Sequence, residues 1–156
     1  MKKIDTVSLN HQLDLHEPCS QHVRGNANSL SIEDSTQNTS LEDMVRQIQN
    51  CQLCQSSLPY TVRPIVQLNS QARILIASQA PGRKAHDSGI PFDDPSGERL
   101  RYWLGIDRKQ FYDSSKIAIL PMGFCYPGKG KTGDLPPRRE CEPAWRQPIL
   151  QQLPSI

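Results

Sequence analysis

The stretch from residue 73 to residue 92 constrains the fold more than any other part of the sequence. It opens with the apolar run 74–77, which is β-branched at two of its four positions. A short apolar run of this kind, bounded by turn residues, predicts a buried strand of a parallel sheet. The strand must end at Pro81 and Gly82, because proline removes a backbone donor and glycine permits a positive φ.

Polar and titratable side chains gather directly after this strand. They are Gln79, Arg83, Lys84, His86 and Asp87. In open α/β sheets, ligands bind in the crevice beyond the carboxyl ends of the strands. We therefore take this turn as the best candidate site in the chain, with an ordinary strand-to-loop junction as the alternative.

A second apolar run, residues 116–122, predicts a second strand. Between the two strands, Asp94 and Pro95 are typical of a helix N-cap and first helical position, and Gly105 is typical of a helix end. Strand, helix and strand in this order predict a right-handed parallel crossover, and hence an α/β fold. The apolar residues that we expect to pack against the sheet are Leu100, Trp103 and Leu104.

Helices are also expected on both flanks of this unit. Ser40 is an N-cap candidate for a helix that begins at Leu41, and residues 141–153 predict a short helix with a kink or its true start at Pro148. The inward residues of the second helix are expected to be Trp145, Ile149 and Leu153. Most sheets have about four to six strands, so two strands indicate the N-terminal part of a larger α/β domain.

Composition sets wider bounds. Residues 1–39 are polar without a sustained period and predict a disordered tail, which leaves one domain over residues 40–156. No apolar run approaches the ~18 residues of a transmembrane helix, and the start lacks a secretory signal, so we expect no membrane contact and a cytoplasmic location.

Residues 51–156 carry 14 basic and 9 acidic side chains. That balance suits a polyanionic partner such as nucleic acid, or simply a mildly basic soluble domain.

Four cysteines follow the tail. Cys51 and Cys54 form a C-x-x-C pair, which indicates a redox pair, a metal knuckle or a coincidence. Cys125 and Cys141 lie in a segment rich in proline and glycine. Four thiolates suit structural zinc or an iron–sulfur cluster, and a reducing compartment disfavours disulfides. A redox role for Cys51 and Cys54 would not explain Cys125 and Cys141. The alternative to a metal site is that the four cysteines are buried thiols without a shared role.

The glycine-rich segment 128–133 invites a phosphate-loop interpretation. That loop requires Gly, four residues and then Gly-Lys-Ser/Thr, and neither register of this segment fits the pattern. No helical pattern follows directly. We therefore expect no nucleotide hydrolysis and interpret the segment as a flexible basic loop able to contact phosphates.

Two patterns together resemble a known family. The loop Ser-Gln-Ala-Pro-Gly at 78–82, followed by Gly-Ile-Pro-Phe at 89–92, resembles the first motif of the uracil-DNA glycosylase superfamily. The cysteine layout is similar to that of its iron–sulfur, family 4-like branch. The resemblance covers about residues 41–156 and implies a parallel-sheet uracil-DNA glycosylase-like fold, incomplete at the C-terminus.

The resemblance also implies roles for individual residues. The four cysteines named above would bind a 4Fe-4S cluster, with zinc as the alternative, and Phe92 would stack on the flipped base. The turn Gln79, Ala80, Pro81 and Gly82 would line the uracil pocket, where its backbone donors would stabilise the uracil anion. The candidate catalytic residues are Gln79, which can orient a water, and His86 and Asp87, which can act as general bases.

The sequence departs from the family pattern at three places. Many iron–sulfur members have Gly-Glu where this chain has Ser78 and Gln79, and residues 121–123 stand where a uracil-reading Asn is expected. The second catalytic motif, with its His, would fall beyond residue 156.

We expect a DNA repair glycosylase-like hydrolase that cleaves the N-glycosidic bond of uracil or another deaminated base. We expect the 156-residue chain itself to be inactive or severely impaired. The alternative is a non-catalytic, metal-stapled nucleic-acid-binding module, and either would be a monomer that binds DNA.

Overall fold

The computed structural model describes residues 39–153 of the chain. The tail expected over residues 1–39 lies outside the described residues, except for Thr39. Within the described part, the elements follow the order helix, strand, three helices, strand and helix, with a short 3₁₀ turn at Gln55–Ser57 and a π-helical turn at Glu142–Arg146. None of the described helices combines the length and the apolar character needed to cross a membrane.

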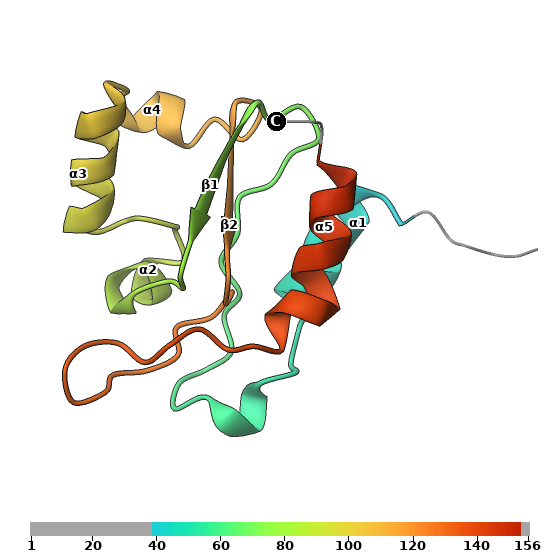
Figure 1. The fold of residues 1–156 in the computed structure, drawn as a ribbon, viewed down its shortest axis with the longest axis vertical. Coiled ribbons are helices and arrows are strands. Elements are labelled where there is room, and N and C mark those ends of the chain that lie inside the picture. The colour runs from blue at the N-terminus through green and yellow to red at the C-terminus, as the bar shows by residue number, and fades with distance from the viewer. Residues whose placement is uncertain (1–38, 154–156) are drawn as a thin grey trace, which may run out of the picture. The chain divides into compact units, whose positions relative to one another are not determined.

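Two parallel strands form the sheet (Figure 1). β1 (Ile74–Ser78) pairs with β2 (Ile117–Pro121) in a register that sets Ile74 opposite Ile117 and Ser78 opposite Pro121. The predicted α/β fold with a parallel crossover is therefore confirmed. The crossover holds three helices where the sequence pattern predicted one: α2 (Arg83–Ser88), α3 (Pro95–Leu104) and α4 (Arg108–Phe111).

The two strands differ in burial because they differ in neighbours. The backbone at Gln67 lies along the free edge of β2 and exchanges two hydrogen bonds with Ile119, of 3.1 and 2.6 Å. All five residues of β2 are buried, whereas Ile74 at the start of β1 is 50% exposed. The prediction of a buried strand at residues 74–77 was thus wrong in part, since within residues 39–153 β1 pairs with β2 alone.

Helices cover both faces of the sheet. α1 (Leu41–Gln49) and α5 (Gln147–Gln152) lie on one side of the strands, and α2, α3 and α4 lie on the other (Figure 1). Successive residues of β2 point to opposite faces. Leu120 accordingly packs with Ile48 and Ile149 from the first pair of helices, while Ile117 and Ile119 pack with Phe111.

The flanking helices form as the sequence predicted. The Ser40 hydroxyl accepts a hydrogen bond from the backbone N–H of Asp43 at 3.2 Å and so caps α1. At the other end of the chain, Ile149 is fully buried, and Trp145 and Leu153 pack against the same cluster. Pro148 has no N–H to donate, and the π-helical turn directly before α5 is the local distortion expected at such a residue.

α3 begins and ends where the sequence predicted, but it turns a different face inward. Asp94 accepts from the N–H of Gly97 at 2.9 Å and caps the helix, and Gly105 ends it with φ of 67°. Trp103 is 71% exposed and Leu104 46% exposed, so the predicted apolar stripe was wrong for both, although Leu100 packs as expected. The inward face instead carries Gly97 and Arg101, which are one helical turn apart and both buried.

Candidate functional site

A cavity of about 270 Å³ opens beyond the carboxyl end of β1. This is the position at which parallel α/β sheets bind ligands. Its size lies just below the usual range for small-molecule sites, about 300–1,000 Å³. The lining comes from the β1–α2 turn, the loop before α3, the end of β2 and a later loop, and includes Ser78, Ala80, Pro81, Gly82, Phe92, Asp94, Ser96, Pro121 and Asp134.

Four of the five residues expected to bind substrate line this cavity. They are Ala80, Pro81, Gly82 and Phe92. Gln79 is exposed and does not line it, although its carbonyl accepts from the N–H of Gly123 at 2.9 Å. A second bond of 2.8 Å joins the Met122 N–H to the Ser78 carbonyl. Together the two bonds extend the pairing of β1 and β2 into the turn and fix the backbone of the turn.

Two carboxylates flank Gly82 inside the cavity. An added Cβ at Gly82 would stand 3.8 Å from Oδ2 of Asp94 and 3.8 Å from Oδ2 of Asp134. Asp94 is committed to capping α3, where its Oδ1 also accepts from Ser96 at 2.5 Å. Asp134 uses Oδ1 to accept from the Tyr126 hydroxyl at 3.2 Å, which leaves its second oxygen beside the turn. Both carboxylates therefore keep Oδ2 beside the turn, and Asp134 is the one that does not cap a helix.

Sequence reasoning missed Asp134 because it lies 52 positions after Gly82, in a segment interpreted as flexible. The structure shows a hydrogen-bonded hairpin there. Lys129 and Asp134 form an antiparallel bridge, and Leu135 N–H donates to the Gly128 carbonyl at 2.8 Å. A Gly-x-x-x-x-Gly segment flanked by residues able to pair was the available signal.

His86 and Asp87 do not reach the cavity. Both lie at the end of α2 and line a separate shallow pocket with Arg63, which donates to their carbonyl oxygens at 2.8 Å each. The Asp87 carboxylate pairs with Arg83 at 2.9 Å on the protein surface. The expected general bases therefore lie outside the cavity that the turn lines.

The His86 ring is enclosed by aromatic side chains. Its centroid lies 5.8 Å from that of Tyr60 and 5.9 Å from that of Tyr126. Its Nδ1 atom is buried and has no hydrogen-bond partner within the described part of the chain. Burial lowers the pKa of His86, so the structure favours the neutral imidazole. Tyr126 contacts this ring and also donates to Asp134, which links the aromatic cluster to the cavity wall.

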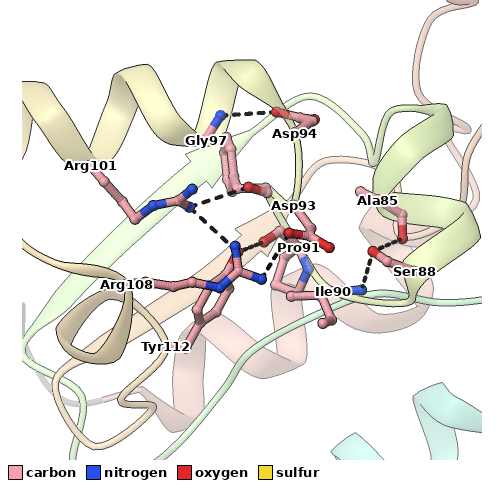
Figure 2. Close-up of polar contacts among 11 residues, drawn as sticks. Ala85, Ser88, Ile90, Pro91, Asp93, Asp94, Gly97, Arg101, Arg108 and Tyr112 are labelled. Carbon is pink, nitrogen blue, oxygen red and sulfur yellow. Dashed lines mark hydrogen bonds and ion pairs between the residues drawn. The ribbon is translucent and has the colours of Figure 1, made fainter.

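Phe92 has an unusual backbone. Its φ of 56° is the one positive value at a non-glycine residue in the described ranges. Its ring stands perpendicular to Phe111, with centroids 5.9 Å apart, and forms part of the cavity wall. The neighbouring residues of the loop are held by side chains from α3 and from the end of α4 (Figure 2).

The four cysteines expected to bind metal come together at one place. All four line a single small pocket, and none forms a disulfide. Burial raises the pKa of Cys54 and Cys141, and it raises that of Cys125 to about 12. A redox C-x-x-C pair requires the opposite shift, a lowered thiol pKa. Within the C-x-x-C pair, the raised pKa of Cys54 is opposite to that shift and does not support the redox interpretation.

Each of these sulfur atoms faces one N–H donor. Such bonds stabilise a thiolate and are the usual outer shell of thiolate-bound metal centres. The donors, in the order of the cysteines, are the Trp145 indole at 3.4 Å, the Arg138 side chain, and the backbone N–H groups of Arg63 and Phe124. Across residues 39–153, no group of three or more His, Cys, Asp or Glu side chains is gathered as a single metal ion would require.

A comparison with known protein families finds a match over the part of the chain that carries the cavity. Residues 65–156 match the family model of the uracil DNA glycosylase superfamily. The matched range is more than half of the 156 residues and includes both strands, the turn at 78–82 and Phe92. The chain therefore belongs to the uracil DNA glycosylase superfamily.

Proposed function

We propose that this protein is a DNA glycosylase that binds an extruded uracil, or another deaminated base, in the cavity at the end of β1 and hydrolyses its N-glycosidic bond. Membership of the superfamily gives a DNA glycosylase-like function, with DNA as substrate, in general terms. The observation that carries the finer proposal is the composition of the cavity wall, which joins a fixed Ala-Pro-Gly turn to an aromatic ring.

The turn supplies hydrogen-bond donors without a competing partner. Within residues 39–153, the backbone N–H groups of Ala80 and Gly82 donate no hydrogen bond. Because the turn is held by Met122 and Gly123, these donors are fixed before a ligand arrives. Preorganised donors of this kind stabilise the charge that develops on a leaving base.

Phe92 and Asp134 complete the proposed site. Enzymes that act on a base extrude it and hold it against aromatic and polar groups, and Phe92 offers the ring. Asp134 replaces His86 and Asp87 as our candidate for orienting the attacking water, because its carboxylate lines the cavity and, unlike that of Asp94, does not cap a helix. We expect slow catalysis, because no histidine lines the cavity in the described part.

We further propose that Cys51, Cys54, Cys125 and Cys141 hold a 4Fe-4S cluster, as in the iron–sulfur branch of the superfamily. Four thiols that line one pocket, with one N–H donor each, suit this group. Four thiolates also suit structural zinc, so zinc stays the alternative to the cluster. When bound, the cluster would act as a structural staple between the end of α1, the loop after β2 and the start of the π-helical turn.

A non-catalytic module that binds nucleic acid is the second candidate. It is favoured by the exposure of Gln79 and by Pro121 in the position where a base-reading Asn was expected. Such a module would use the same four thiols but would not cleave the glycosidic bond. The expectations of a monomer, a cytoplasmic location and a larger domain stay predictions.

The test is base release under single-turnover conditions. The protein, in excess, is incubated with single-stranded and double-stranded oligonucleotides that carry one uracil or one hypoxanthine, and abasic sites are detected by alkaline cleavage. We expect slow release by the wild type and a fall of roughly tenfold or more for Phe92→Ala, because stacking on one base is worth about 1–3 kcal/mol. Selective binding without any release would establish the second candidate instead.

A further inference from the structure

We infer that Arg101 is a positioning residue, which holds the backbone carbonyl of Phe92 and thereby fixes the Phe92 ring in the cavity wall. This inference rests on the proposed function for its purpose, but its structural content can be tested separately. It assigns a role in the site to a side chain of α3 that does not itself line the cavity.

The loop that carries Phe92 is held on both sides of the residue. Arg101 Nη1 donates to the Phe92 carbonyl at 3.3 Å, and the Tyr112 hydroxyl donates to the Pro91 carbonyl at 2.8 Å. On the other side, Arg108 pairs with the Asp93 carboxylate at 2.8 Å. Figure 2 shows these three side chains converging on the loop from α3, α4 and the residue after α4.

Arg101 is buried in a setting that is unusual for a cation. It is 7% exposed and forms no salt bridge within the described residues. Its guanidinium instead lies over the Phe111 ring at 5.3 Å and the Tyr112 ring at 5.8 Å, and it reaches the Tyr112 hydroxyl at 3.5 Å. The Asp93 carboxylate acts on it only from beyond salt-bridge distance, and a buried charge without a direct ionic partner is unfavourable unless its donors are used. The Phe92 carbonyl is one of the few acceptors it has.

The conformation that Arg101 holds is one that Phe92 would not adopt readily. A positive φ at a bulky residue is an outlier, and such outliers persist where the surrounding structure enforces them. Gly97 makes this arrangement possible, because only a residue without a Cβ lets the helix approach the loop so closely. An added Cβ there would lie 1.9 Å from the Phe92 carbonyl oxygen. The helix thus approaches the loop closely through glycine and binds it one turn later through Arg101.

Fluorine NMR can follow the position of the ring directly. The full chain is labelled with 4-fluorophenylalanine, which gives one signal for each of its 3 phenylalanines, and Phe92→Leu identifies the signal of Phe92. Phe124, which lies in the other apolar cluster, serves as the internal reference. Arg101→Gln is compared with Arg99→Gln, an identical change at an exposed position of the same helix.

We expect Arg101→Gln to shift and broaden the Phe92 signal while the Phe124 signal and the Arg99→Gln spectrum keep the wild-type values. Tyr112→Phe removes a single hydroxyl and should move the Phe92 signal less, and it serves if Arg101→Gln does not fold. If Arg101→Gln folds and its Phe92 signal is unchanged, the inference is overturned. If Arg101→Gln does not fold, an unchanged Phe92 signal in Tyr112→Phe overturns it.

The same variants separate this inference from the proposed function. The preference for a uracil-containing strand over its thymine match should fall in Arg101→Gln by up to the roughly tenfold loss expected for Phe92→Ala, because the loss of stacking on one base sets that limit. The double variant with Phe92→Ala should lose no more than Phe92→Ala alone, and losses that multiply would contradict action through Phe92. If the wild type shows no preference for uracil but the Phe92 signal responds as expected, the positioning role stands and the proposed function fails.

Discussion

Replacing Gly97 by alanine tests the packing of α3 against the loop that carries Phe92. An added Cβ would meet the Phe92 carbonyl oxygen at 1.9 Å, its carbonyl carbon at 2.7 Å and its Cβ at 2.8 Å. Two of these atoms belong to the backbone, so no side-chain rotation can relieve the contact. The loop must move by about 1.5 Å to restore an ordinary contact distance of 3.4 Å.

The energetic terms have opposite signs. Alanine in place of glycine within a helix stabilises by about 1 kcal/mol. Overpacking destabilises by about 1–3 kcal/mol, and loss of the hydrogen bonds to the Pro91 and Phe92 carbonyls removes about 1 kcal/mol each. The expected net effect is a loss of about 2–4 kcal/mol, which corresponds to a fall in Tm of about 8–16 °C for a domain of this size.

Thermal and urea unfolding of Gly97→Ala measure this loss directly. Gly82→Ala is the matched control for stability, because Gly82 has φ of −76° and an added Cβ there would lie 3.8 Å from its nearest neighbours, Oδ2 of Asp94 and Oδ2 of Asp134. Gly82→Ala should unfold close to the wild type. A Gly97→Ala protein as stable as the wild type, or more stable as helix propensity alone requires, would refute the reasoning.

Three further predictions concern the site, the thiols and the imidazole. Asp134→Asn should lower single-turnover base release roughly 100-fold or more and leave the affinity for uracil-containing DNA nearly unchanged, because the carboxylate orients water rather than the base. Cys125→Ala should abolish bound iron and acid-labile sulfide, measured after anaerobic purification, whereas Cys19→Ala should not. Because burial lowers the pKa of His86, the folded state binds its proton less readily than the unfolded state. Stability measured by urea unfolding should therefore fall as the pH drops below about 6.5, and His86→Gln should reduce that slope.

The sequence was informative where local chemistry decides the structure. Ser40 and Asp94 cap their helices as predicted, because a short polar side chain before a helix satisfies free N–H groups in almost any context. A strand was predicted over residues 116–122, and the structure places β2 within that run and buries all five of its residues. The turn at Pro81 and Gly82 followed from backbone chemistry alone and does begin the cavity wall.

The errors arose where tertiary contacts override local pattern. Trp103 and Leu104 were expected inside, but the helix turns Gly97 and Arg101 inward because the Phe92 loop needs a close approach and a donor. The pattern of apolar residues along the helix gives no indication that Arg101 is buried. α2 was missed because its six residues include no apolar stripe beyond Ala85.

The site residues divide in the same way. Residues next to each other in the turn could be grouped from sequence, whereas Asp134 could not, since a hairpin brings it to Gly82 from a distant part of the chain. His86 and Asp87 follow the turn closely in sequence, yet they line a separate pocket rather than the cavity. Proximity along the chain therefore predicted the backbone of the site better than its titratable groups.

The most direct test of the proposed function is the affinity of the protein for one damaged base in otherwise identical DNA. Fluorescence anisotropy compares single strands that carry uracil or hypoxanthine with the matched undamaged strands, for the wild type and for Phe92→Ala. The proposal predicts that the wild type binds at least one damaged strand about tenfold or more tightly than its match, and that Phe92→Ala loses this preference. Equal affinities for damaged and undamaged strands, or a preference that a folded Phe92→Ala protein retains, would contradict it.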